Sequence, residues 1–264
     1  MQVLLVPHQQ YRSLFFERTE MTFKSEIYKF CEEIAVDFDE WEFTSTGLFK
    51  NKALKHTDKI VRPGFYFQSG LSCTVGPSAA INNKKTTKLF KQICGYEMPW
   101  TSSIYFQTES TAYRGASSVF AIFPEKIAIR DSRGQLEPWS ERFLIKSQAK
   151  DYLRQVLVDG IRFLDKYYDF SSEENLLRNL PAGFKDRAPE LEALMGHMNN
   201  YFYENIDGIF RCLAAVVLGN FDFVEHYASD DFKTTVPKRE VELKKLLDAL
   251  PELKRQFAQT GKVI

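Results

Sequence analysis

The stretch Gly76–Phe90, GPSAAINNKKTTKLF, passes from a strand pattern to a helix pattern within a few residues. We expect a strand that ends near Asn82, followed by Asn83 as the N-cap of a helix over residues 84–94. Leu89, Phe90 and Ile93 form the apolar stripe of this helix, and Gly95 ends it. The stretch therefore indicates a strand that leads directly into a helix.

The same stretch resembles a degenerate phosphate-binding loop. An intact loop of this type requires the pattern Gly-x-x-x-x-Gly-Lys-Ser/Thr. Counted from Gly76, the second glycine position holds Ile81 and the lysine position holds Asn82. Counted back from Lys85, the two glycine positions hold Lys84 and Ala79. Because neither register supplies the glycines, we do not expect a nucleotide cradle of this type.

The lysines of the predicted helix remain a candidate binding face. They are Lys84, Lys85, Lys88 and Lys91. A helix N-terminus with lysines beside it can bind an anion or an acidic partner. The alternative is a capped helix whose lysines face water.

Short aromatic or β-branched segments surround this helix, at 40–54, 58–70 and 71–82 before it and at 102–110, 117–123, 126–131 and 142–147 after it. Their close spacing favours antiparallel hairpins over parallel units. A helix with Thr22 as its N-cap precedes them. We therefore expect an α+β fold, with an antiparallel sheet and packed helices in residues 1–146.

The pattern changes at Ser147, which we expect to cap a long amphipathic helix ending near residue 168. Helical patterns follow at 189–219 and 238–258, the second interrupted by Pro251, where we expect a break. Residues 147–264 are thus predicted to be all helical. With no flexible linker between them, the two regions are expected to pack as one compact unit.

Composition bears on the class of protein. The 264 residues carry 35 basic and 35 acidic side chains, so a general nucleic-acid-binding role is not expected. Four isolated cysteines form no Cys-x-x-Cys pair, which favours buried, reduced thiols and a cytoplasmic location. Residues 1–10 lack the features of a signal peptide, and no apolar run is long enough to span a membrane.

The sequence contains no recognisable motif for a metal or cofactor site and only one weak match to a nucleophile motif. The four histidines, His8, His56, His197 and His226, lie far apart and form no paired-ligand motif. The Ser147-x-x-Lys150 pair matches a serine–lysine motif, but Ser147 also suits a helix cap. We therefore assign no catalytic residue, no metal site and no cofactor.

An acidic stretch at 32–42, EEIAVDFDEWE, is the second candidate site. Its candidate residues are Asp37, Asp39, Glu40 and Glu42. Asp37 and Asp39 have the spacing to chelate a divalent cation. The stretch also suits a polar junction between a helix and a strand, or an acidic patch that meets a basic protein partner.

Two segments carry a resemblance: FLIKSQAKDYLRQVLVDGIRFLDKYYDFSSEENLLRNL at 143–180 and CLAAVVLGNFDFVEHY at 212–227. Their succession of strand, helix, aromatic-Asp turn and Leu-rich helix resembles bacterial α+β proteins that are common among immunity proteins of polymorphic or contact-dependent toxin systems. The resemblance implies a non-enzymatic cytoplasmic protein that binds and neutralises a cognate protein toxin. Two alternatives stay open: an enzyme, hydrolase or nucleotide-processing, that uses scattered carboxylates with His226, or a weak anion or nucleic-acid binder that uses the lysines.

Overall fold

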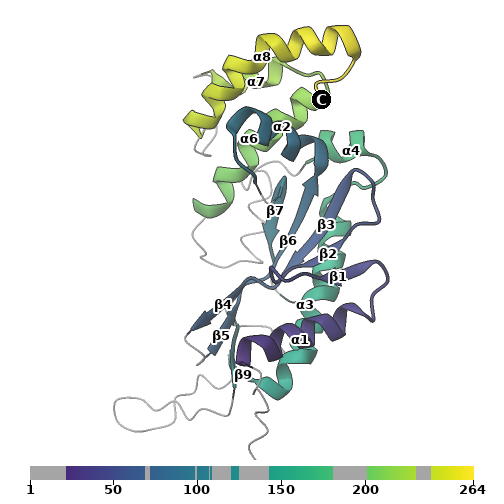
Figure 1. The fold of residues 1–264 in the computed structure, drawn as a ribbon, viewed down its shortest axis with the longest axis vertical. Coiled ribbons are helices and arrows are strands. Elements are labelled where there is room, and N and C mark those ends of the chain that lie inside the picture. The colour runs from purple at the N-terminus through teal and green to yellow at the C-terminus, as the bar shows by residue number, and fades with distance from the viewer. Residues whose placement is uncertain are drawn as a thin grey trace, which may run out of the picture.

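The structure is a computed structural model that describes residues 22–68, 72–98, 100–106, 108, 120–124, 143–180, 201–229 and 239–264. Its fold class is α+β, as the sequence predicts. The strands form two sheets of five and four strands, and helices pack around them (Figure 1). The predicted strand at 126–131 and the start of the predicted helix at 189 lie outside the described residues.

The five-stranded sheet, sheet A, is antiparallel throughout and has the order β1-β2-β3-β6-β7. Its strands are β1 (Trp41–Phe43), β2 (Phe49–Asn51), β3 (Thr57–Arg62), β6 (Ser78–Asn83) and β7 (Ser102–Tyr105). The register sets Asp58 opposite Asn82 and Val61 opposite Ala79. Since alternate residues face opposite sides, Val61 and Asp58 lie on different faces of the sheet.

The four-stranded sheet, sheet B, has the order β4-β5-β8-β9. Its strands are β4 (Phe65–Gln68), β5 (Ser72–Val75), β8 (Phe120–Phe123) and β9 (Phe143–Ile145). β8 and β9 pair in parallel, which corrects the expectation of a purely antiparallel arrangement. Some twenty residues separate these two strands in the sequence, so a tight antiparallel hairpin is not imposed on them.

Two glycines lie where the chain crosses from one sheet to the other. Gly64 separates β3 from β4, and Gly76 separates β5 from β6. The amide of Gly76 donates a hydrogen bond to the carbonyl of Gly64 at 3.3 Å. Gly64 has a φ of +66°, and a Cβ there would lie 2.2 Å from the Gly76 carbonyl oxygen. The two chain segments therefore approach closely enough to exclude any side chain at Gly64.

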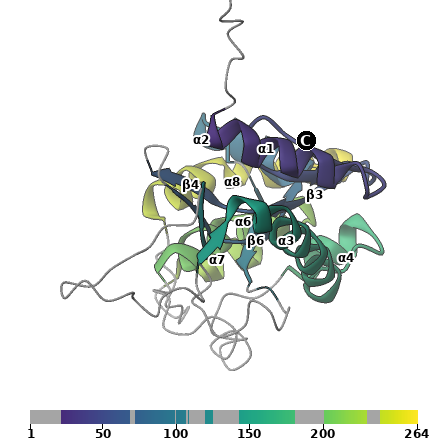
Figure 2. The ribbon, with the colours of Figure 1, turned by 90° about the horizontal axis from the view of Figure 1, so that it is seen from below.

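The larger core lies under helices α1 (Phe23–Ala35) and α3 (Lys146–Tyr167), which lie beside each other (Figures 1 and 2). Ile27 and Ile34 of α1 pack with Val156 of α3 and with residues of both sheets. Thr22 caps α1 as predicted, accepting a hydrogen bond from the Ser25 amide at 3.2 Å. This core holds the helices on one face of sheet A.

The second core lies at the end of sheet A beyond β6 and β7 (Figure 1). It is formed by the helices α2 (Lys84–Cys94), α6 (Tyr201–Val217), α7 (Asp222–Ala228) and α8 (Glu240–Thr260). Phe90 of α2 stacks on Phe210 of α6 at 5.4 Å between ring centroids. The remaining described helix, α4 (Glu173–Arg178), contacts α6. Residues from both sides of position 146 contribute to each core.

Two predictions about helix ends were wrong. Ser147 does not cap α3, because the helix begins at Lys146 and Ile145 holds the N-cap position. Pro251 does not break α8, which runs from Glu240 to Thr260. Leu250 and Leu253, on either side of the proline, are both buried in the second core, so packing holds the two halves in one helix.

Candidate functional site

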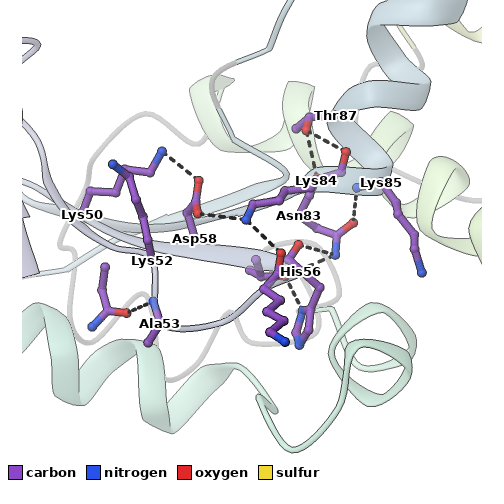
Figure 3. Close-up of polar contacts among 12 residues, drawn as sticks. Lys50, Lys52, Ala53, His56, Asp58, Asn83, Lys84, Lys85 and Thr87 are labelled. Atoms are coloured by element: carbon purple, nitrogen blue, oxygen red, sulfur yellow. Dashed lines mark hydrogen bonds and ion pairs between the residues drawn. The ribbon is translucent and has the colours of Figure 1, made fainter. Parts of the chain in front are cut away.

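The start of α2 is the site that most resembles a phosphate cradle, and Asn83 occupies it (Figure 3). The buried Asn83 side chain accepts hydrogen bonds from the amides of Lys85 at 3.1 Å and Thr86 at 3.0 Å. The amide of Lys84 donates to the carbonyl of His56 at 3.0 Å. Because all three amides already have acceptors, this helix terminus offers none of them to a phosphate.

The amide group of Asn83 also joins three elements. Its Nδ2 lies within hydrogen-bond distance of the His56 carbonyl (3.3 Å), Thr57 Oγ1 (3.2 Å) and Glu173 Oε1 (3.0 Å). Its backbone amide donates to Thr101 Oγ1 at 2.8 Å. Asn83 therefore links α2, β3 and α4, and its position reflects folding rather than ligand binding.

Three of the four predicted lysines form ion pairs with carboxylates of this chain. The pairs are Lys84–Asp58 (3.9 Å), Lys85–Glu173 (2.5 Å) and Lys91–Glu97 (2.5 Å). Lys84 Nζ also donates to the carbonyl of Lys55 at 2.8 Å. Within the described residues, only Lys88 of the four is exposed without an ion pair. The predicted basic face thus presents little uncompensated charge.

The Lys85–Glu173 pair is partly shielded from solvent, with 21% of the Glu173 side chain exposed. Burial pushes the pKa of Glu173 upward, but the hydrogen bonds from Lys85 and Asn83, together with the charge of Lys85, outweigh it and lower the pKa. Glu173 is therefore held in its charged form, as a partner of Lys85 and Asn83. A carboxylate bound in this way is poorly suited to act as a proton acceptor in catalysis.

The acidic residues lie where α1 turns into β1, at residues 36–42, which we call the acidic corner. Asp37 pairs with Arg154 of α3, and Glu42 pairs with Lys52. Asp39 and Glu40 are exposed and form no ion pair with any described residue. Asp37 and Asp39 therefore differ in their environment, and the paired Asp37 is not free to chelate a cation.

Glu40 has a φ of +65°, in the left-handed region that favours glycine and asparagine. A residue with a Cβ pays about 1 kcal/mol to adopt this conformation. The exposed Glu40 side chain makes no ion pair with the described residues that would offset this cost. Backbone strain of this kind is concentrated at functional sites, so the glutamate suggests a role for its side chain.

Val36 completes the acidic corner and was not identified from the sequence. It is 85% exposed, directly after the last residue of α1. Ile27, Cys31 and Ile34 define the buried face of α1 at helical spacing. Val36 lies two positions beyond Ile34, about 200° further round at 3.6 residues per turn. That offset is the signal that distinguishes Val36 from the core residues.

The four cysteines are free thiols, and all four are buried, as the sequence predicts. Burial raises the pKa of Cys73 to about 12 and that of Cys212 to about 12. The pKa values of Cys31 and Cys94 are also raised, chiefly by burial. Since the thiolate is the reactive form, none of these thiols is set up as a nucleophile.

In the part of the chain that the structure describes, no group of three or more His, Cys, Asp or Glu residues is placed to hold a metal ion. His226 lies exposed on α7, whereas His56 is half-buried beside Thr57, with its Nδ1 2.8 Å from Thr57 Oγ1. His8 and His197 lie outside the described residues. Among the described helices, none combines the length and apolar character needed to cross a membrane.

Comparison of the chain with protein-family models, with curated proteins and with solved structures finds no match. Two surfaces were predicted from the sequence, and the structure places them on different elements: the lysines on α2 and the acidic residues between α1 and β1. Of the two, the acidic corner keeps exposed charge beside an exposed apolar side chain.

Proposed function

We propose that this chain is a non-enzymatic binding protein of the immunity type, which binds a cognate protein toxin and neutralises it in the cytoplasm. The observation that carries the proposal is the acidic corner, where Val36 is 85% exposed and the neighbouring Asp39 and Glu40 form no ion pair with a described residue. An exposed apolar side chain within a charged rim is a common arrangement in protein interfaces. The resemblance at 143–180 and 212–227 agrees with this role.

The charge of the acidic corner indicates the kind of surface it meets. Unpaired carboxylates attract a basic patch on the toxin and accelerate the encounter, while Val36 provides apolar contact once the surfaces meet. Toxins that act on nucleic acids or phosphorylated substrates carry basic active sites. A protein whose acidic corner docks over such a site blocks the entry of substrate without any chemistry of its own.

The lysines of α2 support this choice of surface by their own contacts. Lys85 and Lys91 already face Glu173 and Glu97 at 2.5 Å, so binding an acidic partner there would first require breaking internal ion pairs. Asp39 and Glu40 have no such competitor among the described residues. The acidic corner is therefore the surface at which a charged partner can bind without breaking an internal ion pair of Asp39 or Glu40 with a described residue.

The proposal implies that a neighbouring gene encodes the toxin, and the test is co-expression with the toxic domain of that gene, scored by growth rescue and by co-purification. The proposal expects rescue and a complex with the wild-type chain. It expects loss of both in a Val36→Asp, Asp39→Lys variant that remains folded. Glu240→Gln on α8 is the matched control, because Glu240 is exposed and distant from the acidic corner. Neither rescue nor a complex with the wild-type chain would refute the proposal.

A further inference from the structure

A small pocket lies where α4, α6 and α7 meet, away from the acidic corner. Its volume is about 160 Å³. Its apolar wall includes Leu177 and Leu180 from α4 and the residues after it, Leu218 after α6, and Phe223 of α7. A pocket for a drug-sized ligand has roughly 300–1,000 Å³, so this one suits a much smaller molecule.

The polar residues that line the pocket are Arg178, Arg211 and Asn220, and each carries hydrogen-bond donors in its side chain. Arg211 of α6 is half-buried, and its guanidinium forms no ion pair with a described residue; it lies 5.7 Å from the Phe223 ring centroid. The Asn220 side-chain oxygen accepts from the Phe223 amide at 3.3 Å, which leaves its Nδ2 group as a donor. Arg178 lies at the rim, paired with Glu174 at 2.6 Å.

Arg211 has no carboxylate partner among the described residues, so its guanidinium is available to an anion that enters the pocket. A ligand carboxylate would compensate the guanidinium, since the planar fork of arginine matches a carboxylate in a two-point contact. The leucines and Phe223 on the other side of the pocket favour a short hydrocarbon for the rest of the ligand. A phosphate fits less well, because its larger charge and additional oxygens call for more donors than Arg211, Asn220 and the already paired Arg178 supply.

We propose that the pocket between α4, α6 and α7 binds a free short-chain monocarboxylate, with its carboxylate on Arg211 and its hydrocarbon against Leu177 and Leu218. This site is independent of the proposed toxin-binding role. The two are tested by different measurements on different surfaces, so either one can fail alone.

The experiment is isothermal titration of the full chain with hexanoate, and in parallel with hexanamide, which has the same shape without the charge. For a ligand of about eight non-hydrogen atoms, we expect a Kd of roughly 1 mM for hexanoate. Binding of hexanamide is expected to be at least about tenfold weaker, as hydrogen bonds to charged groups imply. Equal binding of both compounds, or no saturable binding of hexanoate, would overturn the proposal.

Two variants locate the site. Arg211→Met keeps an apolar stem but removes the guanidinium, and Asn220→Asp keeps the acceptor for the Phe223 amide while adding a negative charge. Both are expected to weaken hexanoate binding by about tenfold or more. Arg255→Met on α8 is the matched control, because Arg255 pairs with Glu252 away from the pocket. Unchanged affinity in both pocket variants would overturn the assignment.

The source of the carboxylate is distinguished by a further titration with N-acetyl-glycyl-leucine, which ends in a free α-carboxylate. Binding of hexanoate at least as tight as that of the dipeptide supports a free acid. Tighter binding of the dipeptide would assign the pocket to the end of a polypeptide chain and overturn the free-acid proposal.

Discussion

Gly160 of α3 lies so close to Val61 of β3 that a Cβ on the glycine would be 2.5 Å from the valine Cγ1. The glycine sits in the middle of a 22-residue helix, where its flexibility is a disadvantage. Its absence of a side chain is what allows α3 to lie against sheet A. The larger core therefore depends on this one close approach.

Gly160→Ala is expected to destabilise the protein by about 1–3 kcal/mol, because overpacking outweighs the gain of about 1 kcal/mol in helix propensity. Urea unfolding followed by circular dichroism measures the change. Gly76→Ala is the matched control, since a Cβ at Gly76 would have no atom within 4 Å. A more stable Gly160→Ala variant would contradict the close approach of α3 and β3.

Removal of two buried hydroxyls, one on β6 and one on α2, is expected to change the stability of the protein in opposite directions. Ser78 Oγ is buried and has no hydrogen-bond partner among the described residues, whereas Thr86 Oγ1 contacts the Asn83 carbonyl at 3.1 Å and Thr101 Oγ1 at 2.8 Å. Ser78→Ala is expected to stabilise the protein by about 1 kcal/mol, and Thr86→Val to destabilise it by about 1–2 kcal/mol. Thermal unfolding of both variants provides the test, and a shift of the same sign in both would contradict it.

Local sequence signals predicted three helix ends correctly, although the same kind of signal was wrong for Ser147. Thr22, Asn83 and Gly95 were assigned as helix ends from residue type and spacing, and the structure has each of them at that place. Such ends depend on hydrogen bonds between residues a few positions apart, which a single sequence displays directly. The α+β class follows from the same local patterns.

Features that depend on distant residues were not predictable. The division into two sheets depends on the approach of Gly64 to Gly76, and the continuity of α8 through Pro251 depends on packing against other helices. At the candidate site, the capping role of Asn83 was predicted, but its contact with Glu173, ninety positions away, was not. The ion pair between Lys85 and Glu173 also joins residues far apart in the sequence, so the sequence predicted the lysine but not the carboxylate that neutralises it.

Glu173 is expected to make stability depend on pH. Its pKa is lowered in the folded protein, because the hydrogen bonds from Lys85 and Asn83 and the charge of Lys85 outweigh the opposing effect of burial. The resulting stability is fully present above the unfolded pKa of about 4.3 and is lost as the pH falls through the lower folded pKa. Glu173→Gln should therefore cost about 1–2 kcal/mol at neutral pH and less in acid.

Urea unfolding of the wild type and of Glu173→Gln at neutral pH and near pH 3 measures this difference. Glu97→Gln is the control, since Glu97 also pairs with a lysine at 2.5 Å but its side chain is 73% exposed. Its effect is expected to be smaller at both pH values, as solvent screens an exposed pair. A Glu173→Gln deficit that stays constant from neutral pH to acid would contradict the role of the charged carboxylate.

Two substitutions of Glu40 distinguish its effect on stability from its effect on binding at the acidic corner. Glu40→Gly relieves the left-handed strain and is expected to stabilise the free protein by about 0.5–1 kcal/mol, after the flexibility of glycine is taken into account. Glu40→Gln keeps the strain and removes only the charge, so its stability should match the wild type.

Both variants lose the same carboxylate. If the toxin-binding proposal holds, both should therefore associate with the toxin more slowly and to a similar extent, and the difference from the wild type should be larger at low salt. Unfolding measurements together with association rates at two salt concentrations test both halves of this prediction. A Glu40→Gly variant that is more stable and associates as fast as the wild type would show that the strained glutamate serves no binding role.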